Sequence, residues 1–187
     1  MPRPARFTRS EVIASALQLA DEQGLAAVTM SAVAARLGVT PMALYAHVDS
    51  KEHLLDLLVE AVLCELPDAD DLHEGWSQLE ILARALRRTA GRHPAVFPLL
   101  LQRPAVAEGS LRLRARIRDA LHACGVPVDA ADRGERLVST IALGFIASET
   151  SGRFAEVPPE QRDADFELLL DLVRQGLPVL HRGSSPR

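Results

Sequence analysis

The sequence predicts an all-α protein, and three observations carry this prediction. Of the 187 residues, 48% are hydrophobic and only 4% are aromatic, while alanine, leucine, arginine and glutamate, which are good helix formers, are abundant. β-branched residues never run long enough to favour a sheet. Apolar residues also recur at the three- and four-residue spacing of one helix face. We therefore expect helices joined by short turns, in a chain long enough to bury a core.

The first predicted helix covers residues 9–23. Thr8 is followed three residues later by Glu11, the pattern of a capping box in which each side chain satisfies a free backbone amide at the helix start. Gly24 can adopt the left-handed conformation that ends a helix. Both ends of this helix are therefore marked in the sequence.

Two short helices follow and together form a helix-turn-helix pattern. We expect one at 30–37, capped by Thr29, and one at 41–47, where Pro41 at the first helical position loses no hydrogen bond. Gly38 lies between them, at a turn with little room for a Cβ. The chain reverses here within a few residues.

A long helix at 50–66 begins the second part of the chain. Prolines and glycines separate the helices expected after it. These cover residues 74–92, 94–102, 108–124, 130–152 and 160–180. We divide the chain into an N-terminal helix-turn-helix unit at 1–49 and a C-terminal helical unit at 50–187.

Charge is distributed unevenly along the chain. The net charge is −4, yet residues 1–51 hold five basic and four acidic residues, and the first nine carry Arg3, Arg6 and Arg9 without an acid. Positive charge is thus concentrated beside the helix-turn-helix pattern, in modest excess. Non-specific affinity for DNA should be weak and should fall quickly with salt.

Targeting and redox signals are few. Residues 1–30 lack the apolar segment of a signal peptide, and no apolar run approaches membrane-spanning length, so we expect a soluble cytoplasmic protein. Cys64 and Cys124 are far apart and are interpreted as two buried thiols. Asp119 and His122 share a helix face, but nothing pairs with them at ligand spacing, so no metal and no cofactor is expected.

Residues 9–63 resemble the DNA-binding region of the TetR (tetracycline repressor) family. The resemblance is carried by Gly24-Leu25, Val28-Thr29-Met30, the string from Val33 to Val39, Leu44-Tyr45-Ala46-His47-Val48, and Ser50-Lys51-Glu52-His53-Leu54-Leu55. It implies a dimeric transcriptional regulator, by family default a repressor, that binds a palindromic operator in double-stranded DNA and is released by a small-molecule effector. Two alternatives are a helical ligand-binding protein that has lost DNA binding and a small helical enzyme, for which no catalytic motif is present.

The resemblance continues more weakly into the C-terminal unit. Trp76, the Arg-His-Pro that ends at Pro94, and Arg103-Pro104 are similar to the branch nearest the tetracycline repressor itself. In that branch, His and Glu side chains hold the drug together with a divalent metal. The stretch from Pro98 to Pro104 contains no histidine, so we expect neither tetracycline nor a metal here.

The resemblance assigns the recognition helix to residues 41–47, with Leu44 and Val48 facing the core. The candidate DNA contacts on it and just before it are Thr40, Pro41, Met42, Ala43, Tyr45 and His47. Met42 and Ala43 suit thymine methyls, whereas Thr40 and Tyr45 suit phosphate or sugar. Tyr45 also suits a half-buried packing role, and His47 a cap at the helix end.

Four further residues complete the candidate DNA-binding set: Thr29, Ser31, Arg36 and Lys51. Thr29 would bring a helix N-terminus against phosphate, and Lys51 suits a phosphate contact. Ser31 stands where relatives often have a base-reading arginine, so one direct contact can be absent. Arg36 is equally a solvated surface residue.

The segment 160–180 predicts a dimer interface, because it is apolar on two faces. One face carries Phe166, Leu169, Leu170, Val173 and Leu177, and the other carries Leu168 and Leu172. Small residues in 130–152 permit close helix approach. We expect a four-helix interface between two copies, with Leu170 in its seam.

An effector pocket is expected between the helices of residues 74–152. Its candidate lining is Trp76, Phe97, Leu100, Gln102, Phe145 and Glu149, each of which could equally be ordinary core. An unpaired Glu149 in an apolar cavity would favour a cationic or hydrogen-bond-donating lipophile.

Overall fold

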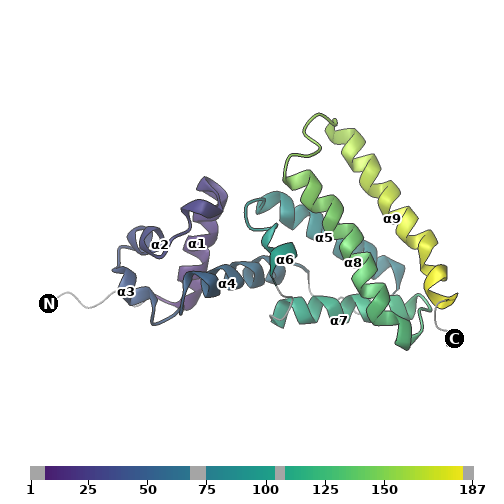
Figure 1. The fold of residues 1–187 in the computed structure, drawn as a ribbon, viewed down its shortest axis with the longest axis horizontal. Coiled ribbons are helices and arrows are strands. Elements are labelled where there is room, and N and C mark those ends of the chain that lie inside the picture. The colour runs from purple at the N-terminus through teal and green to yellow at the C-terminus, as the bar shows by residue number, and fades with distance from the viewer. Residues whose placement is uncertain (1–6, 68–74, 104–107, 183–187) are drawn as a thin grey trace.

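The computed structural model describes residues 7–67, 75–103 and 108–182 (Figure 1), and Arg3, Arg6 and Pro104 lie outside them. Within these ranges every regular element is helical, which confirms the all-α prediction. In chain order the elements are α1 (Arg9–Gln23), the 3-10 turn η1 (Leu25–Ala27), α2 (Met30–Leu37), α3 (Pro41–Leu44), α4 (Lys51–Cys64), α5 (Trp76–Arg92), α6 (Leu99–Gln102), α7 (Glu108–Ala123), α8 (Val128–Thr150) and α9 (Pro159–Arg182).

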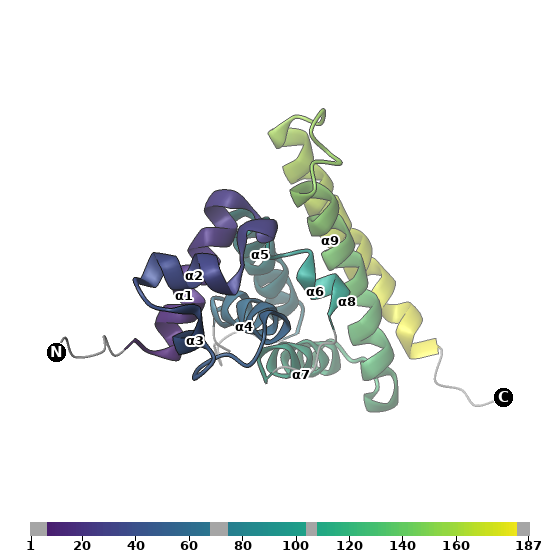
Figure 2. The same cartoon turned by 60° about the vertical axis from the view of Figure 1, so that its left-hand side comes forward.

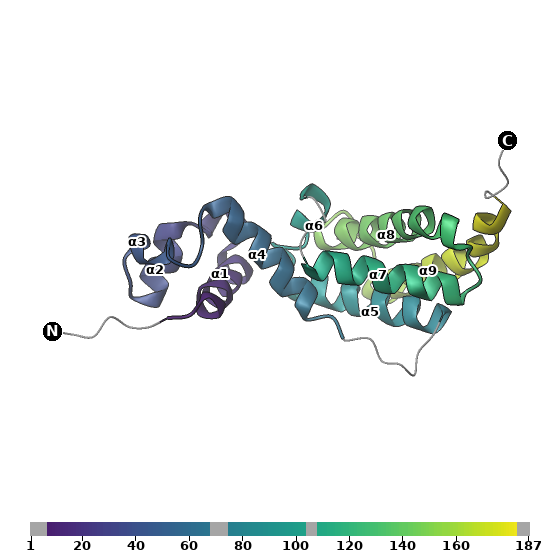
Figure 3. The ribbon, with the colours of Figure 1, turned by 90° about the horizontal axis from the view of Figure 1, so that it is seen from below.

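Two groups of helices lie at opposite ends of the molecule, with α4 running between them (Figures 1 and 3). The first comprises α1, α2 and α3, and the second comprises α5 to α9. α4 contacts both α1 and α7. The boundary expected between residues 49 and 50 falls at the N-cap of α4, and one buried cluster continues from Val12 on α1 through Leu58 to Phe97. The two groups are therefore joined by a shared helix.

The first group is fixed by local signals that the sequence displays. Thr8 Oγ1 accepts a hydrogen bond from the Glu11 amide at 3.2 Å, and the Thr8 amide donates to Glu11 Oε2 at 2.7 Å, which completes the capping box. Gly38 ends α2 in the left-handed conformation, with φ of 69°. Leu44 and Val48 are fully buried in the core, as predicted.

Several helices differ in length from the expectation; α4, for example, covers Lys51–Cys64 instead of 50–66. α3 ends at Leu44 instead of His47, because the next three residues form turns, with the His47 amide donating to the Leu44 carbonyl. The expected helix at 94–102 is reduced to α6, since Pro98 has no amide to donate to the carbonyl of Pro94. α9 instead continues through Pro178 to Arg182.

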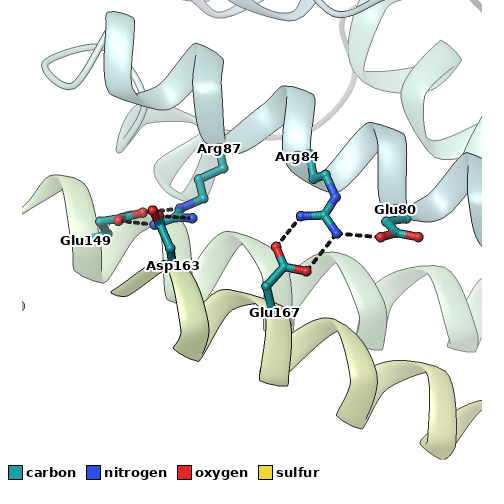
Figure 4. Close-up of polar contacts among 6 residues, drawn as sticks. All are labelled: Glu80, Arg84, Arg87, Glu149, Asp163 and Glu167. Atoms are coloured by element: carbon teal, nitrogen blue, oxygen red, sulfur yellow. Dashed lines mark hydrogen bonds and ion pairs between the residues drawn. The ribbon is translucent and has the colours of Figure 1, made fainter. Parts of the chain in front are cut away.

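Two arginines of α5 hold the α8–α9 pair in place (Figure 4). Arg87 forms a bidentate ion pair with Glu149 of α8, with N–O distances of 2.6 and 2.7 Å, and also contacts Asp163 of α9. Arg84 bridges Glu167 of α9 and Glu80 of its own helix. The hydrogen bond to Glu149 raises the pKa of Arg87, and the one from Arg84 lowers the pKa of Glu167.

Candidate DNA-binding surface and effector cavity

The recognition segment, residues 41–47, lies at the end of the molecule that is formed by α1, α2 and α3 (Figure 1). Its inner side is anchored by Leu44, while Met42 is 77% exposed and Tyr45 is 48% exposed. Single exposed apolar side chains are common on protein surfaces, so this exposure shows only that the outer face of α3 is not packed against the rest of the protomer. The outer face of α3 is therefore free to contact another molecule.

The other DNA-binding candidates are placed around this face. Thr40, Pro41, Ser31, Thr29 and Lys51 are exposed. Ala43 is half-buried. The Thr29 hydroxyl also accepts a hydrogen bond from the Ala32 amide at 3.1 Å, so it serves as the N-cap of α2.

His47 and Arg36 both have partners within the chain. The His47 ring is half-buried and lies against Phe7, with centroids 4.8 Å apart. The Arg36 guanidinium donates to both carboxylate oxygens of Glu22 at 2.6 Å, which lowers the pKa of Glu22. Arg36 is therefore ion-paired on the surface, and its role as a phosphate contact stays a prediction.

A cavity of about 430 Å³ lies among α4, α5, α6, α7 and α8, a size typical of small-molecule sites. Its lining includes apolar side chains of all five helices, such as Val59, Leu63, Leu79, Leu82, Leu86, Leu100, Leu101, Leu113, Ile117, Val138 and Leu143. The polar members are Arg103, Ser110, Arg114, Glu135, Arg136, Ser139 and Thr140. Most of the surface that a ligand would meet is apolar.

The six residues expected to line one pocket are not brought together. Only Leu100 lines this cavity. Phe97 is fully buried in the core, and Gln102 is exposed. Phe145 packs against Phe154 and Phe166. Trp76 lies elsewhere, with the Arg174 guanidinium 5.8 Å from its ring centroid.

The expected polarity of the pocket must be corrected as well. Glu149 is not unpaired, because its bidentate ion pair with Arg87 satisfies both carboxylate oxygens (Figure 4). The buried carboxylate of the cavity is Glu135, which is 3% exposed. Glu135 accepts hydrogen bonds from Arg114 Nε at 3.2 Å and from Ser139 Oγ at 3.1 Å. The sequence signal that we missed is the spacing of Glu135 and Ser139, two polar residues four apart on one face of α8.

Arg103 connects the cavity to the helix that follows the recognition segment. It lines the cavity, and its guanidinium contacts the carboxylates of Glu52 and Asp56 in the first turns of α4. It also donates to the Glu52 carbonyl at 3.2 Å. Arg103 therefore links the lining of the cavity to the first turns of α4 by direct contacts.

His93 joins three helices on the other side of α4. Its Nδ1 lies 2.9 Å from Asp21 of α1, and its Nε2 lies 2.9 Å from Glu65, directly after α4. Arg92 adds a second ion pair to Glu65 at 2.7 Å. The end of α5 is thus tied both to the first helix group and to the end of α4.

The apolar face left uncovered lies on α8 and α9, which run side by side in Figures 1 and 2. Its exposed large residues are Leu137, Ile141, Leu168, Leu172 and Val179. Leu170, which we had placed in the seam, is only 6% exposed and belongs to the core of the protomer, whereas Leu172 is 61% exposed. The outward face of α9 is therefore the one that carries Leu168 and Leu172.

The structure also bears on the expectations for the cysteines and for membrane-spanning segments. Cys64 is exposed, so the interpretation of two buried thiols is wrong for it, whereas Cys124 is half-buried and desolvation raises the pKa of its thiol. Both cysteines are free. Among the described helices, none combines the length and apolar character needed to cross a membrane.

Comparison with known proteins agrees with this architecture. Residues 12–58 match the family described as "Bacterial regulatory proteins, tetR family", and residues 79–173 match "Tetracyclin repressor-like, C-terminal domain". An N-terminal helix-turn-helix unit and a C-terminal helical unit define a two-part regulator of the helix-turn-helix class. The chain belongs to the TetR family.

Individual relatives share both units. The HTH-type transcriptional repressor DrrR1 of Streptomyces coeruleorubidus is 29% identical over 173 residues, which cover 88% of this chain and 62% of DrrR1, so the chain spans less than two thirds of that relative. BioQ of Mycobacterium smegmatis superposes with a TM-score of 0.80 at 28% identity, covering 94% of this chain and 99% of BioQ. A BioQ structure with its double-stranded DNA operator superposes with a TM-score of 0.78, also at 28% identity, over 92% of this chain and 98% of that one.

Proposed function

We propose that this chain is a ligand-responsive transcriptional repressor that binds a palindromic operator as a homodimer. The observation that carries the proposal is the outer face of α3, where Met42 and Tyr45 stand exposed on a firmly anchored helix-turn-helix. Such a helix enters the major groove of DNA in proteins of this class. The superposition on a BioQ structure that contains its double-stranded DNA operator supports DNA binding.

A dimer follows from the size of this surface and from the uncovered face of α8 and α9. α3 has four residues, which is too few to specify a site alone. Pairing two copies through the face that contains Leu168 and Leu172 would bury it. The two recognition segments should then lie about 34–36 Å apart, so that they reach successive major grooves on one side of the DNA.

The cavity is the proposed effector site, and Arg103 is its proposed link to DNA binding. A ligand can release the operator only if it prefers a state in which the recognition segments no longer match the groove spacing. Arg103 contacts both the cavity and the first turns of α4, the helix that immediately follows the recognition segment. Displacing Arg103 would therefore reposition α4.

Fluorescence anisotropy with DNA from upstream of the protein's own gene tests DNA binding. Tyr45→Ala and Lys51→Ala should each weaken binding by about 1–3 kcal/mol or less without unfolding the protein. Lys51→Ala should also reduce the salt slope by about one, since one phosphate contact is lost.

Arg88→Ala, at an exposed position of α5 away from the α8–α9 face, is the control and should bind DNA like the parent protein. If Tyr45→Ala and Lys51→Ala both bind like the parent, the DNA-binding surface lies elsewhere. A folded protein with no affinity for the upstream DNA would favour a helical ligand-binding protein that has lost DNA binding.

A further inference from the structure

Polar and apolar residues are separated on the walls of the cavity. The lining from α4, α5 and α6 is entirely apolar and includes Leu63, Leu82 and Leu100. The polar lining comes from α7 and α8, apart from Arg103, which is held by two carboxylates of α4. A molecule that fills this cavity must therefore be apolar on one side and polar on the other.

The polar wall carries an excess of positive charge. Arg114 and Arg136 oppose the single carboxylate of Glu135. Each oxygen of Glu135 already accepts one hydrogen bond, from Arg114 Nε and from Ser139 Oγ. Within the part of the chain that the structure describes, Arg136 has no ion-pair partner, and Arg114 uses only its Nε. The groups on this wall that remain available to a ligand are therefore guanidinium donors and not a carboxylate.

We propose that the cavity binds an acidic amphiphile, with an apolar body against α4, α5 and α6 and a carboxylate, or an equally acidic oxygen, at Arg114 and Arg136. Guanidinium groups bind carboxylates through paired, charge-assisted hydrogen bonds, and because Arg136 is exposed and Arg114 half-buried, the head group would lie at the mouth of the cavity. A cationic head would instead face two like charges. This proposal rests on the proposed function only in taking the cavity as the effector site, and it reverses the polarity expected from Glu149.

Three probes that share one apolar body test the polarity: anthracenecarboxylate, anthracenemethanol and anthracenemethylamine. Binding to the full-length protein is measured by calorimetry and by the shift in unfolding temperature. The acid should bind at least about tenfold more tightly than the amine, because the amine is protonated at neutral pH and would face the two guanidinium groups, whereas the acid forms charge-assisted hydrogen bonds with them. The alcohol should fall between them.

Variants locate the head group. Arg136→Gln and Arg114→Gln should each weaken binding of the acid by about tenfold, and that of the alcohol by about twofold or less. Glu135→Gln keeps an acceptor for Ser139 and removes the only negative charge, so it should strengthen binding of the acid. Arg133→Gln, on the same helix but outside the cavity lining, is the matched control and should leave all three affinities unchanged.

The outcomes separate this proposal from the proposed function. If the amine binds more tightly than the acid, if none of the three probes binds, or if Arg136→Gln and Arg114→Gln leave the acid unaffected, the assignment of an acidic ligand is overturned. If the acid binds through these arginines but leaves the protein on its operator, the ligand class stands and the coupling to DNA is refuted. If the amine both binds and releases the operator, the repressor stands and the ligand class falls.

Discussion

The helix-turn-helix end and the α8–α9 end of the molecule bury their apolar residues in different ways. Around α3 the core residues Leu44 and Val48 are fully buried, and the exposed face is small. Along α8 and α9, five large apolar residues remain exposed on one face, and a cavity lies next to it. The first region is complete within one protomer. In the proposed dimer a second copy would cover the second region, which would place partner recognition and the proposed ligand response in the same half of the chain.

The sharpest way to break this comparison is to charge the uncovered face. Leu172→Arg should prevent dimer formation and reduce operator affinity by at least about a hundredfold, since burying an unpaired charge costs several kcal/mol. The variant should remain folded, because Leu172 is exposed in the protomer. Light scattering and DNA anisotropy measure the two effects. A Leu172→Arg protein that stays dimeric at micromolar concentration would place the interface elsewhere.

Substitution of a core residue in the helix-turn-helix should lower the free energy of unfolding. Leu44→Ala removes a fully buried side chain and should lower the free energy of unfolding by about 2–5 kcal/mol. Met42→Ala, on the exposed side of the same helix, should change it by about 0.5 kcal/mol or less while weakening operator binding. Urea unfolding of both variants provides the measurement. Equal losses of stability would mean that α3 is packed on both faces.

The turn between α2 and α3 gives a smaller effect. The expected lack of room for a Cβ at Gly38 is wrong, because a Cβ added there meets no atom within 4 Å. Its φ is 69°, so only backbone strain opposes Gly38→Ala. We expect a loss of about 1 kcal/mol in unfolding free energy. Gly91→Ala, also free of contacts but in the last turns of α5, should stabilise the protein by about 0.5–1 kcal/mol. Opposite signs in thermal unfolding would confirm the distinction.

The smallest effect concerns the ion pair between α5 and α9. The hydrogen bond from Arg84 holds the pKa of Glu167 below its ordinary value of 4.5. The pair therefore stabilises the fold above pH 4.5, and this stabilisation is lost as the pH falls through the lowered pKa of the folded protein.

Glu167→Gln should lower stability at neutral pH by about 1 kcal/mol or less, because the pair is exposed, and should reduce the loss of stability on acidification. Glu160→Gln changes an exposed carboxyl of α9 and is the control. Stability measured between pH 3 and 7 decides the matter. Identical acid profiles for Glu167→Gln and the parent would contradict the role of Arg84.

Helix ends in the first half of the chain could be predicted from the sequence, because they depend on contacts between near neighbours. The capping box at Thr8 and the left-handed Gly38 determine helix ends through contacts only a few residues apart in sequence, and both are found. The end of α3 was misplaced, because the turn after Leu44 satisfies its amides without continuing the helix. In the C-terminal half, periodicity identified two apolar faces on the last helix. It could not tell which one turns inward, since both are rich in leucine.

The pocket was misplaced for a related reason. Glu135 and Glu149 lie fourteen residues apart on α8, close to four full turns, so they occupy nearly the same helix face about 21 Å apart along the axis. Sequence periodicity gives the face and leaves open which turn lies against the cavity. That is decided by how α5 and α7 cross α8, and by Arg87, which pairs with Glu149.

The two ends of α4 form ion pairs with different parts of the molecule, so the helix can tilt about one end. Its fourteen residues measure about 20 Å along the axis. His93 holds Glu65 just beyond one end, as a pivot, while Arg103 holds Glu52 and Asp56 at the other. A tilt of about 10° around the pivot would carry the end beside the recognition segment through about 3.5 Å, given the rise of 1.5 Å per residue. Arg103 pairs with α4 at the end far from this pivot, so in the proposed function a displacement of Arg103 would move the DNA-binding end of α4 by nearly the same distance.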